Sequence, residues 1–232
     1  MERLDKYLCD SLDFTRSEIK KEIAKGNVTV NAQTVTKPDF KINPEGDKVY
    51  FKNTIVEPFS FSYYMMNKPK GVVSATEDRN DITVLDLIKE KNRNLSMVGR
   101  LDKDTTGLLL LTDDGELLHK LISPRHRIFK KYFVTVSSPL DDNSLKIFET
   151  GVDIGDEKPT LPASYEIVDD YHLYLSICEG RFHQVKRMLS AIGNNVTELK
   201  RVSEGNLSLD ESLLPGDYRK LTEEEIKELR EC

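Results

Sequence analysis

A charged segment bracketed by two glycines, residues 99–107, carries the side chain best suited to nucleophilic chemistry. Asp102 is flanked there by Arg100 and Lys103, two cations that would keep a carboxylate ionised and available as a nucleophile or a base. The segment leads directly into the apolar run Leu108–Leu111, which is typical of a buried strand, and loops anchored on buried strands hold catalytic groups rigidly. The alternative is a surface turn whose charges neutralise one another, since such pairs contribute less than about 1 kcal/mol.

A second segment begins with a strand end and a glycine, and continues as an amphipathic helix that we predict over Arg181–Ile192. Arg181, Lys186 and Arg187 lie near the N-terminus of that helix, where the helix dipole is already positive. Positive charge is unfavourable there unless an anion is bound, so a phosphate or a carboxylate such as Asp102 would resolve the conflict. A solvated basic face is the alternative that needs no ligand.

A third segment, residues 119–131, is basic, contains no acidic residue and includes His126 and Phe129. Its cations are Lys120, Arg125, Arg127, Lys130 and Lys131. Cations interleaved with aromatic rings suit RNA, because phosphates take the charge and exposed bases stack on rings. Tyr132 follows at the start of a predicted strand, a place where an aromatic side chain is more often part of the core.

Other common chemistries lack their usual sequence support. The four histidines have no metal-ligand spacing, and the three cysteines are scattered, so we expect neither a metal site nor a disulfide framework. P-loop, dinucleotide-binding, nucleophile-elbow and zinc-hydrolase motifs do not occur.

The composition indicates a soluble globular protein that can bury a sizeable core. The chain has 232 residues, 38% of them hydrophobic, and its first fifteen residues are too charged for a signal peptide. With no apolar run long enough to span a membrane, we expect a cytoplasmic protein that does not bind membranes. The net charge of −6 does not exclude nucleic acid, because the basic segments act locally, within about 10 Å.

Two regions must position these side chains. Residues 1–57 predict two helices and a small sheet, and the second helix begins with a capping box, in which Thr15 is the N-cap and Glu18 follows three residues later. Gly26 ends that helix. Its exposed sides carry the basic pairs Arg16 with Lys20 and Lys21 with Lys25.

Residues 58–232 form the second region, where many strands alternate with a few helices. Predicted strands include Tyr63–Asn67, Leu108–Thr112 and Tyr132–Val136, and a Thr222–Glu225 capping box begins a final helix. The fold class that we expect is α+β with a mixed, mostly antiparallel sheet.

Four ordered motifs closely resemble those of the bacterial pseudouridine synthases that modify ribosomal RNA. The motifs are Met66–Ser74, Gly99–Leu108, Lys131–Tyr132 and Glu179–Met188. The N-terminal region is similar to the small alpha-L RNA-binding domain named after the fourth protein of the small ribosomal subunit. The resemblance therefore implies a small RNA-binding domain over residues 1–57 and a catalytic domain over residues 58–232.

The resemblance also implies a reaction and its residues. Uracil is detached from carbon 1′ of its ribose, turned and rejoined through carbon 5, an isomerisation that needs no cofactor or metal. Asp102 would attack the ribose or the base, and Lys186 would hold it ionised, with Arg187 as the other candidate. Tyr132 would stack under the flipped uracil. Phe182 stands where tyrosine is frequent in this family, which puts any role for a hydroxyl there in doubt.

The substrate and partners follow from the same resemblance. Finer features of the motifs imply uridine 516 of 16S rRNA, in free RNA or in a small-subunit assembly intermediate, and we expect a monomer. A 23S rRNA target and a non-catalytic RNA-binding assembly factor are the alternatives. The expected RNA contacts are Arg16, Lys20, Lys21, Lys25, Lys68, Arg100, Arg125, Arg127, Lys130, Arg181, Gln184 and Arg187.

Overall fold

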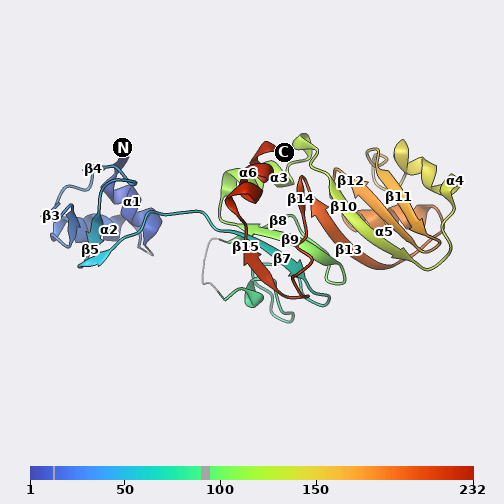
Figure 1. Ribbon diagram of the computed structural model, residues 1–232, viewed down its shortest axis with the longest axis horizontal. Coiled ribbons are helices and arrows are strands. Elements are labelled where there is room, and N and C mark those ends of the chain that lie inside the picture. The colour runs from blue at the N-terminus through green and yellow to red at the C-terminus, as the bar shows by residue number, and fades with distance from the viewer. Residues whose placement is uncertain (13, 90–94) are drawn as a thin grey trace. The chain divides into compact units, whose positions relative to one another are not determined.

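The computed structural model describes residues 1–12, 14–89 and 95–232, and it divides into two compact units, Met1–Ser60 and Phe61–Cys232 (Figure 1). The sequence suggested a division after residue 57. Val56 is the last residue packed in the N-terminal unit, where its carbonyl accepts a hydrogen bond from the Tyr7 hydroxyl at 2.7 Å. Residues 57–60 follow without regular structure, so the two boundaries enclose the same folded module.

The N-terminal unit packs two helices on a small sheet. Its elements are β1 (Glu2–Arg3), α1 (Leu4–Ser11), α2 (Arg16–Ala24), β2 (Val28–Val30), β3 (Gln33–Thr34), β4 (Lys41–Ile42), β5 (Val49–Phe51) and β6 (Thr54–Ile55). The strands run in the order β3-β2-β5-β6, and β1 pairs with β4. Leu4 and Leu8 of α1 share a core with Ile19 and Ile23 of α2, as their helical spacing predicts.

The predicted capping box at the start of α2 is present. The Glu18 N–H donates to Oγ1 of Thr15 at 3.3 Å, and the Thr15 N–H donates to Oε2 of Glu18 at 2.8 Å. Gly26, with φ at +81°, adopts the left-handed conformation that glycine favours just beyond a helix end. The ends of this helix were therefore predicted correctly from the sequence.

A buried carboxylate makes the stability of this unit depend on pH. Asp5 is fully buried, and its two oxygens accept hydrogen bonds from Nε and Nη2 of Arg3, each at 2.9 Å. These bonds lower the pKa of Asp5 from 3.8 to about 2. Because the folded state holds this proton less tightly than the unfolded state, the resulting stability is present above about pH 4 and is lost as the pH falls towards 2.

We expect the Asp5→Asn variant to remove this part of the acid sensitivity. When the pH is lowered from 5 to 2, the decrease in the free energy of unfolding of residues 1–60 should be about 2 kcal/mol smaller in the variant than in the parent protein. Urea titrations of the full chain, followed by amide NMR signals of residues 1–60, measure this difference. The matched control is Asp10→Asn, an exposed carboxylate on the same helix, which should leave the pH dependence nearly unchanged. Equal pH dependence in parent and Asp5→Asn would contradict the argument.

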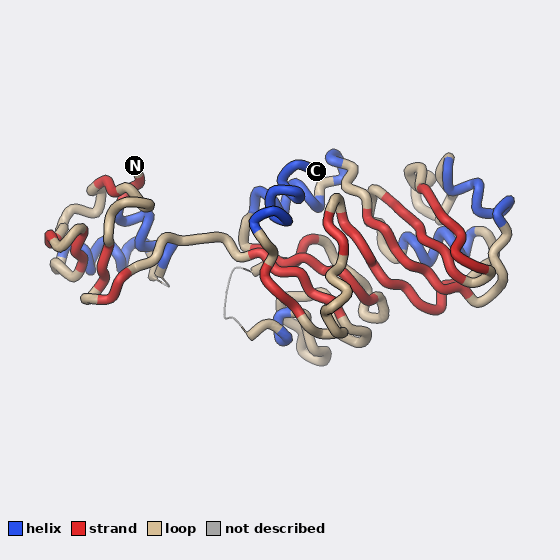
Figure 2. Tube along the Cα trace, viewed as in Figure 1, coloured by secondary structure: helices blue, strands red, loops and turns tan. Residues whose placement is uncertain are grey.

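The C-terminal unit is built on one large sheet (Figure 2). Its strands are β7 (Tyr63–Lys68), β8 (Ser96–Val98), β9 (Thr106–Thr112), β10 (Lys130–Val136), β11 (Ser164–Asp169), β12 (His172–Ile177), β13 (Val196–Glu204), β14 (Leu207–Ser208) and β15 (Tyr218–Lys220). The order is β11-β12-β10-β13-β9-β7-β15, with β8 paired to β9 and β14 paired to β13. Pairing is antiparallel except between β13 and β9, which are parallel, so the predicted α+β class with a mixed, mostly antiparallel sheet is confirmed.

Helices cover parts of both faces of this sheet. They are α3 (Gly115–Ile122), α4 (Asp142–Leu145), α5 (Gln184–Ala191) and α6 (Glu223–Glu231), with 3-10 turns at Leu85–Leu87, Pro124–His126 and Lys146–Glu149. Leu108 and Leu110 of β9 pack in one core with residues of α3 and α6, and Leu109 and Leu111 pack in the core that includes α5. Burial on both faces explains the continuous apolar run of β9.

The helix α5 begins later than its sequence pattern predicts. We expected it to start at Arg181, but it starts at Gln184, after His183 in a left-handed conformation with φ at +49°. Residues 181–183 form a turn instead, closed by the Gln184 N–H, which donates to the Arg181 carbonyl at 3.1 Å. Arg181 therefore lies outside the helix, whereas Lys186 and Arg187 lie in its first turn.

No described helix is long and apolar enough to cross a membrane.

Candidate active site

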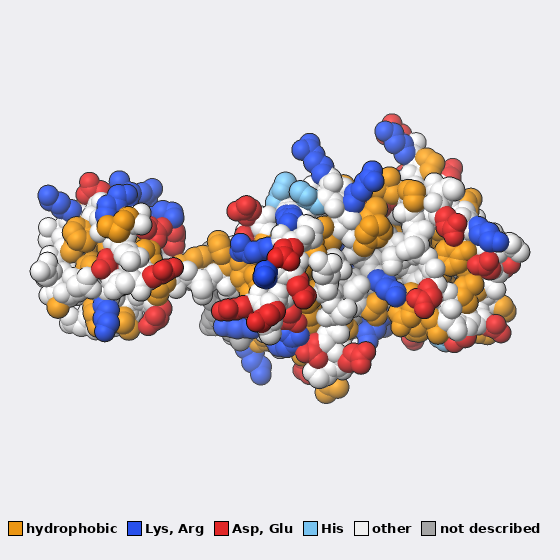
Figure 3. All heavy atoms as spheres, turned by 45° about the horizontal axis from the view of Figure 1, so that its top comes forward, with side chains coloured by type: hydrophobic (Ala, Val, Ile, Leu, Met, Phe, Trp, Pro, Cys, Tyr) orange, Lys and Arg blue, Asp and Glu red, His pale blue; other side chains and the backbone are white. Residues whose placement is uncertain are grey.

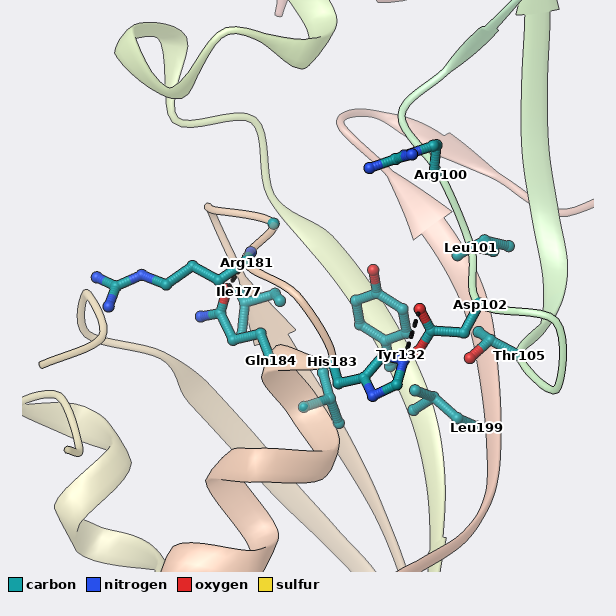
Figure 4. A pocket seen from close by; sticks show the side chains of 12 residues that line it. Arg100, Leu101, Asp102, Thr105, Tyr132, Ile177, Arg181, His183, Gln184 and Leu199 are labelled. Carbon is teal, nitrogen blue, oxygen red and sulfur yellow. Dashed lines mark hydrogen bonds and ion pairs between the residues drawn. The ribbon is translucent and has the colours of Figure 1, made fainter. Parts of the chain in front are cut away.

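The loop that carries Asp102 lines a cavity between β9, β10 and the start of α5 (Figure 4). Its lining residues are Arg100, Leu101, Asp102, Thr105, Tyr132, Ile177, Gly180, Arg181, His183, Gln184, Val185 and Leu199. Three of the four sequence motifs thus contribute to one site. Leu101, Ile177 and Leu199 contribute apolar side chains to the lining, and Asp102 contributes a carboxylate.

The remaining motif, Met66–Ser74, contributes Lys68, which supports the loop that carries Asp102. Its side chain is fully buried, and Nζ donates to the carbonyls of Asp102 at 3.1 Å and Thr105 at 3.0 Å. Burial lowers the pKa of Lys68 to about 8. The expectation that Lys68 contacts RNA is wrong, because its buried ammonium group donates its hydrogen bonds to backbone carbonyls of the protein. Its role is to fix the conformation of the loop.

The carboxylate of Asp102 faces two side chains from the α5 region. Nζ of Lys186 lies 3.1 Å from its Oδ2, and Nε2 of His183 lies 3.5 Å from its Oδ1. Lys186 also contacts Oδ1 of Asp104 at 2.6 Å. Burial alone would lower the pKa of Lys186, but its hydrogen bonds to Asp104 and Asp102 outweigh this effect and raise it. The ammonium group therefore stays charged and balances Asp102.

The cations adjacent to Asp102 in sequence are not its partners. Lys103 turns away and pairs with Asp81 at 2.6 Å. Arg100 is exposed at the rim of the cavity, and no ion pair is seen for it within the described part of the chain. The argument from adjacent residues thus identified Asp102 but not its partner, whereas Lys186, the partner that the resemblance implies, does contact it.

Tyr132 forms one side of the cavity from the central strand β10. It is 8% exposed, and burial raises the pKa of its hydroxyl, an effect that the neighbouring Arg201 guanidinium opposes. Arg201 stands directly opposite Tyr132 in the register of β10 with β13, so the two side chains share a face of the sheet. A buried phenol that is protonated and held beside a cation can act as both a stacking surface and a proton donor.

Sequence reasoning missed a buried charge pair on the strand next to Tyr132. Arg201 is 1% exposed, its Nε donates to the Leu108 carbonyl at 2.7 Å, and its Nη2 lies 3.2 Å from Oε2 of the fully buried Glu204. Nζ of Lys130 lies 3.8 Å from the other Glu204 oxygen. The signal that could have revealed the pair is an arginine two residues after Leu199, at an inward position of the strand β13.

Several residues expected to contact RNA have partners inside the protein instead. Arg181 pairs with Glu179 at 3.0 Å, Arg187 pairs with Asp156, and the amide of Gln184 donates to Glu179 at 2.7 Å. These side chains brace the turn before α5, so the expectation that they bind RNA is wrong for Gln184, which is 4% exposed. Carboxylates of this chain pair with the cations in the first turn of the helix.

Lys130 needs the same correction. Only 13% of its side chain is exposed, and Nζ donates to the Ile128 carbonyl at 3.2 Å beside Glu204. In contrast, Arg125 and Arg127 are exposed in and after the 3-10 turn at Pro124–His126. The basic segment thus offers fewer surface cations than its composition indicates.

The α2 helix presents the other expected RNA contacts. Lys20 and Lys21 are exposed, and Lys25 is exposed beside Glu22, its partner at 2.7 Å. Arg16 reaches Asp5 at 3.4 Å, although 55% of its side chain remains exposed. Figure 3 shows Lys and Arg side chains gathered along one side of this unit.

In the described residues, no cluster of His, Cys, Asp and Glu could hold a metal ion. The site instead consists of one carboxylate, one ammonium group and one buried phenol around a small cavity, in a catalytic unit that follows a two-helix module.

This fold and site define an RNA-modifying isomerase, and the chain belongs to the RNA pseudouridylate synthase family, whose model matches residues 62–191. Residues 2–49 match the S4 domain, an RNA-binding module. Both results confirm the resemblance found in the sequence motifs. Members of this family convert uridine to pseudouridine, so the protein is an isomerase.

Individual relatives match along nearly the whole chain. Ribosomal small subunit pseudouridine synthase A of Escherichia coli K12 is 44% identical over 226 residues, which cover 97% of this chain and 98% of the relative. The protein of the same name from Haemophilus influenzae is 41% identical over 230 residues, which cover 98% and 99%. A crystal structure of a pseudouridylate synthase aligns with a TM-score of 0.70 at 40% identity, covering 99% of this chain and 100% of that one.

Proposed function

We propose that this protein converts a uridine of small-subunit ribosomal RNA to pseudouridine, and that the target is uridine 516 of 16S rRNA. The observation that carries the proposal is the Asp102 carboxylate, paired with Lys186 and facing the Tyr132 side of one cavity. The names of the relatives from Escherichia coli and Haemophilus influenzae support the small subunit as the source of the RNA. The segments Asp104–Gly107, Leu111–Gly115, Ser123–His126 and Pro215–Arg219 resemble the small-subunit enzyme more than its large-subunit relatives, and this resemblance supports uridine 516.

The geometry supports Asp102 as the nucleophile. In the reaction the bond from ribose C1′ to N1 of uracil breaks, a bond from C1′ to C5 forms, the proton on C5 is lost and N1 gains a proton, so that atoms balance without a cofactor. Asp102 can attack either C1′ or the base, because both are electrophilic positions of a uridine in this cavity. Lys186, held by Asp104 as well, places a positive charge 3.1 Å from the Asp102 carboxylate before the attack.

Tyr132 would stack against the uracil once that base has left the RNA helix. A base inside a helix cannot reach a protein carboxylate, and flipping it out costs a few kcal/mol. The apolar side chains of Leu101, Ile177 and Leu199 in the lining favour a largely apolar ring in the cavity. The Tyr132 hydroxyl, whose pKa burial raises, would exchange a proton with the turned base.

Phosphate contacts must offset the cost of flipping, and the exposed cations of α2 suit this role. We expect the double variant Lys20→Gln with Lys21→Gln to flatten the salt dependence of RNA binding, because each lost phosphate contact reduces the slope of log affinity against log salt by about 0.7–0.9. Dissociation constants at four salt concentrations give the slope. Lys6→Gln is the control, since Lys6 of α1 is paired with Glu2 at 2.6 Å. If the slope does not change, the module does not bind RNA through this face.

The decisive experiment is to map pseudouridines in the ribosomal RNA of cells that lack this protein. We expect loss of pseudouridine at position 516 of 16S rRNA, restored by the wild-type chain and not by an Asp102→Asn variant. Loss of a pseudouridine in 23S rRNA instead would favour the large-subunit alternative. Complete modification together with a defect in small-subunit assembly would favour a non-catalytic RNA-binding factor.

A further inference from the structure

Phe182 projects into solvent beside the active-site cavity. Its side chain is 75% exposed, more than that of any other phenylalanine among the described residues. A single exposed apolar residue is common on protein surfaces and by itself indicates nothing. The support and the location of this ring distinguish it from the others.

The ring stacks on its neighbour in a turn that hydrogen bonds brace. It stacks on the ring of His183 with a centroid separation of 3.8 Å and an interplanar angle of 18°. Nη1 of Arg187 donates to the Phe182 carbonyl at 3.1 Å, and the Arg181 N–H donates to Oε1 of Gln184 at 3.0 Å. His183 has φ at +49°, a conformation that residues other than glycine keep only where their surroundings enforce it. The stacked pair is therefore formed before any ligand arrives.

The location of the pair connects it to the reaction. His183 lines the cavity, and its Nε2 lies 3.5 Å from Oδ1 of Asp102, as Figure 4 shows. One face of the Phe182 ring is covered by His183, and the side chain is otherwise largely open to solvent. A uridine flipped into the cavity leaves the nucleotides next to it without a stacking partner. Exposed aromatic rings stabilise such unstacked bases in single-stranded RNA.

We propose that Phe182, supported by His183, stacks on the base of a nucleotide adjacent to the target uridine. This inference rests on the proposed function and extends it, since it adds a second base-binding position outside the cavity. Every base has an aromatic face, so the position would accept any of the four bases. The ligand is an unpaired nucleobase, and specificity for the target must come from other contacts.

The test is a thermodynamic cycle between the protein and the RNA. RNA fragments containing the target uridine carry an abasic nucleotide at the position before it, at the position after it, or at neither. The proteins are wild type, Phe182→Leu, which keeps an apolar side chain without a ring, and Phe182→Trp, which keeps a ring. Dissociation constants are measured by fluorescence anisotropy, and pseudouridine formation by single-turnover assays.

Phe182→Leu should weaken binding of the intact fragment by roughly 10-fold or more, and Phe182→Trp should restore it. With an abasic nucleotide at the stacked position, wild type and Phe182→Leu should bind equally, whereas an abasic nucleotide at the other position should preserve their difference. Tyr171→Leu, which removes an exposed ring from the turn between β11 and β12, is the control and should show no such coupling. Thermal melts establish that the variants are folded.

Equal affinity of wild type and Phe182→Leu for the intact fragment would overturn the proposal. So would a loss of the same size on all three fragments, which would indicate a general effect on the turn. A Phe182 surface that binds a protein instead would give equal RNA affinities in all variants. Failure of the proposed function is recognised separately, because wild type would then bind the fragments but form no pseudouridine in them.

Discussion

Replacing Asp102 with asparagine is expected to abolish pseudouridine formation and to leave RNA binding intact. Asparagine has the same shape, but its amide is neutral and cannot form the covalent bond that the reaction requires. Loss of a nucleophile reduces turnover by as much as about 10⁶-fold in other covalent catalysts. The Asp102 carboxylate is 30% exposed, and its backbone carbonyl, held by Lys68, is unaffected by the change, so the loop should keep its conformation.

Asp104→Asn is the matched control for this prediction. Asp104 lies in the same loop and contacts the same ammonium group of Lys186, at 2.6 Å, but it does not line the cavity. We expect a far smaller loss of single-turnover rate, because Lys186 keeps Asp102 as a partner. Filter-binding constants for both variants, measured on the same RNA, separate chemistry from binding. Turnover by Asp102→Asn within tenfold of wild type would exclude Asp102 as the nucleophile.

The second large effect is expected at Arg201. The Arg201→Met variant should lower the free energy of unfolding of the C-terminal unit by about 3–5 kcal/mol, because it leaves Glu204 fully buried and, among the described residues, with Lys130 at 3.8 Å as its nearest remaining cation. It also removes the hydrogen bond to the Leu108 carbonyl. Urea unfolding of the full chain, followed by amide signals of β9 and β10, measures the loss.

The double variant Arg201→Met with Glu204→Leu tests the cause of that loss. If the cost arises from an unpaired buried charge, removing the charge should recover most of the stability, and the two substitutions should be strongly non-additive. Additive effects would mean that the pair is not coupled. The double variant should fold. Its activity should still be reduced, because it lacks Arg201, the residue that lies opposite Tyr132 in the sheet.

Local features of the fold were predictable because they depend on neighbouring residues. The capping boxes at Thr15 and Thr222 follow from side chains three residues apart, and both are present. The β9 strand follows from an apolar run that only burial on both faces allows. The resemblance of the motifs then placed Asp102, Tyr132 and Lys186 in one site, and the structure brings these three residues together.

Features that depend on distant residues were not predictable from neighbouring residues alone. Lys186, 84 positions away, was expected beside Asp102 only from the charge at the predicted helix start and from the resemblance, whereas the cations next to Asp102 in sequence point elsewhere. Lysine is rarely buried, so nothing local indicated that Lys68 is an internal support. The predicted start of α5 was wrong because the amphipathic pattern continues through residues 181–183. These residues form a turn instead, in which His183 has a positive φ.

The parallel pairing of β13 with β9 determines when during folding this site can come into existence. Arg201 of β13 reaches the Leu108 carbonyl of β9 across a separation of 93 residues, and contacts of such range are made late because the chain between them must first lose much of its freedom. Among the described residues, β13 joins the strand that follows Asp102 to the strand that carries Tyr132. Before β13 pairs with β9, these two segments are therefore not held next to each other. We therefore expect catalytic competence to appear in the slowest refolding phase of the C-terminal unit, after its hairpins have formed.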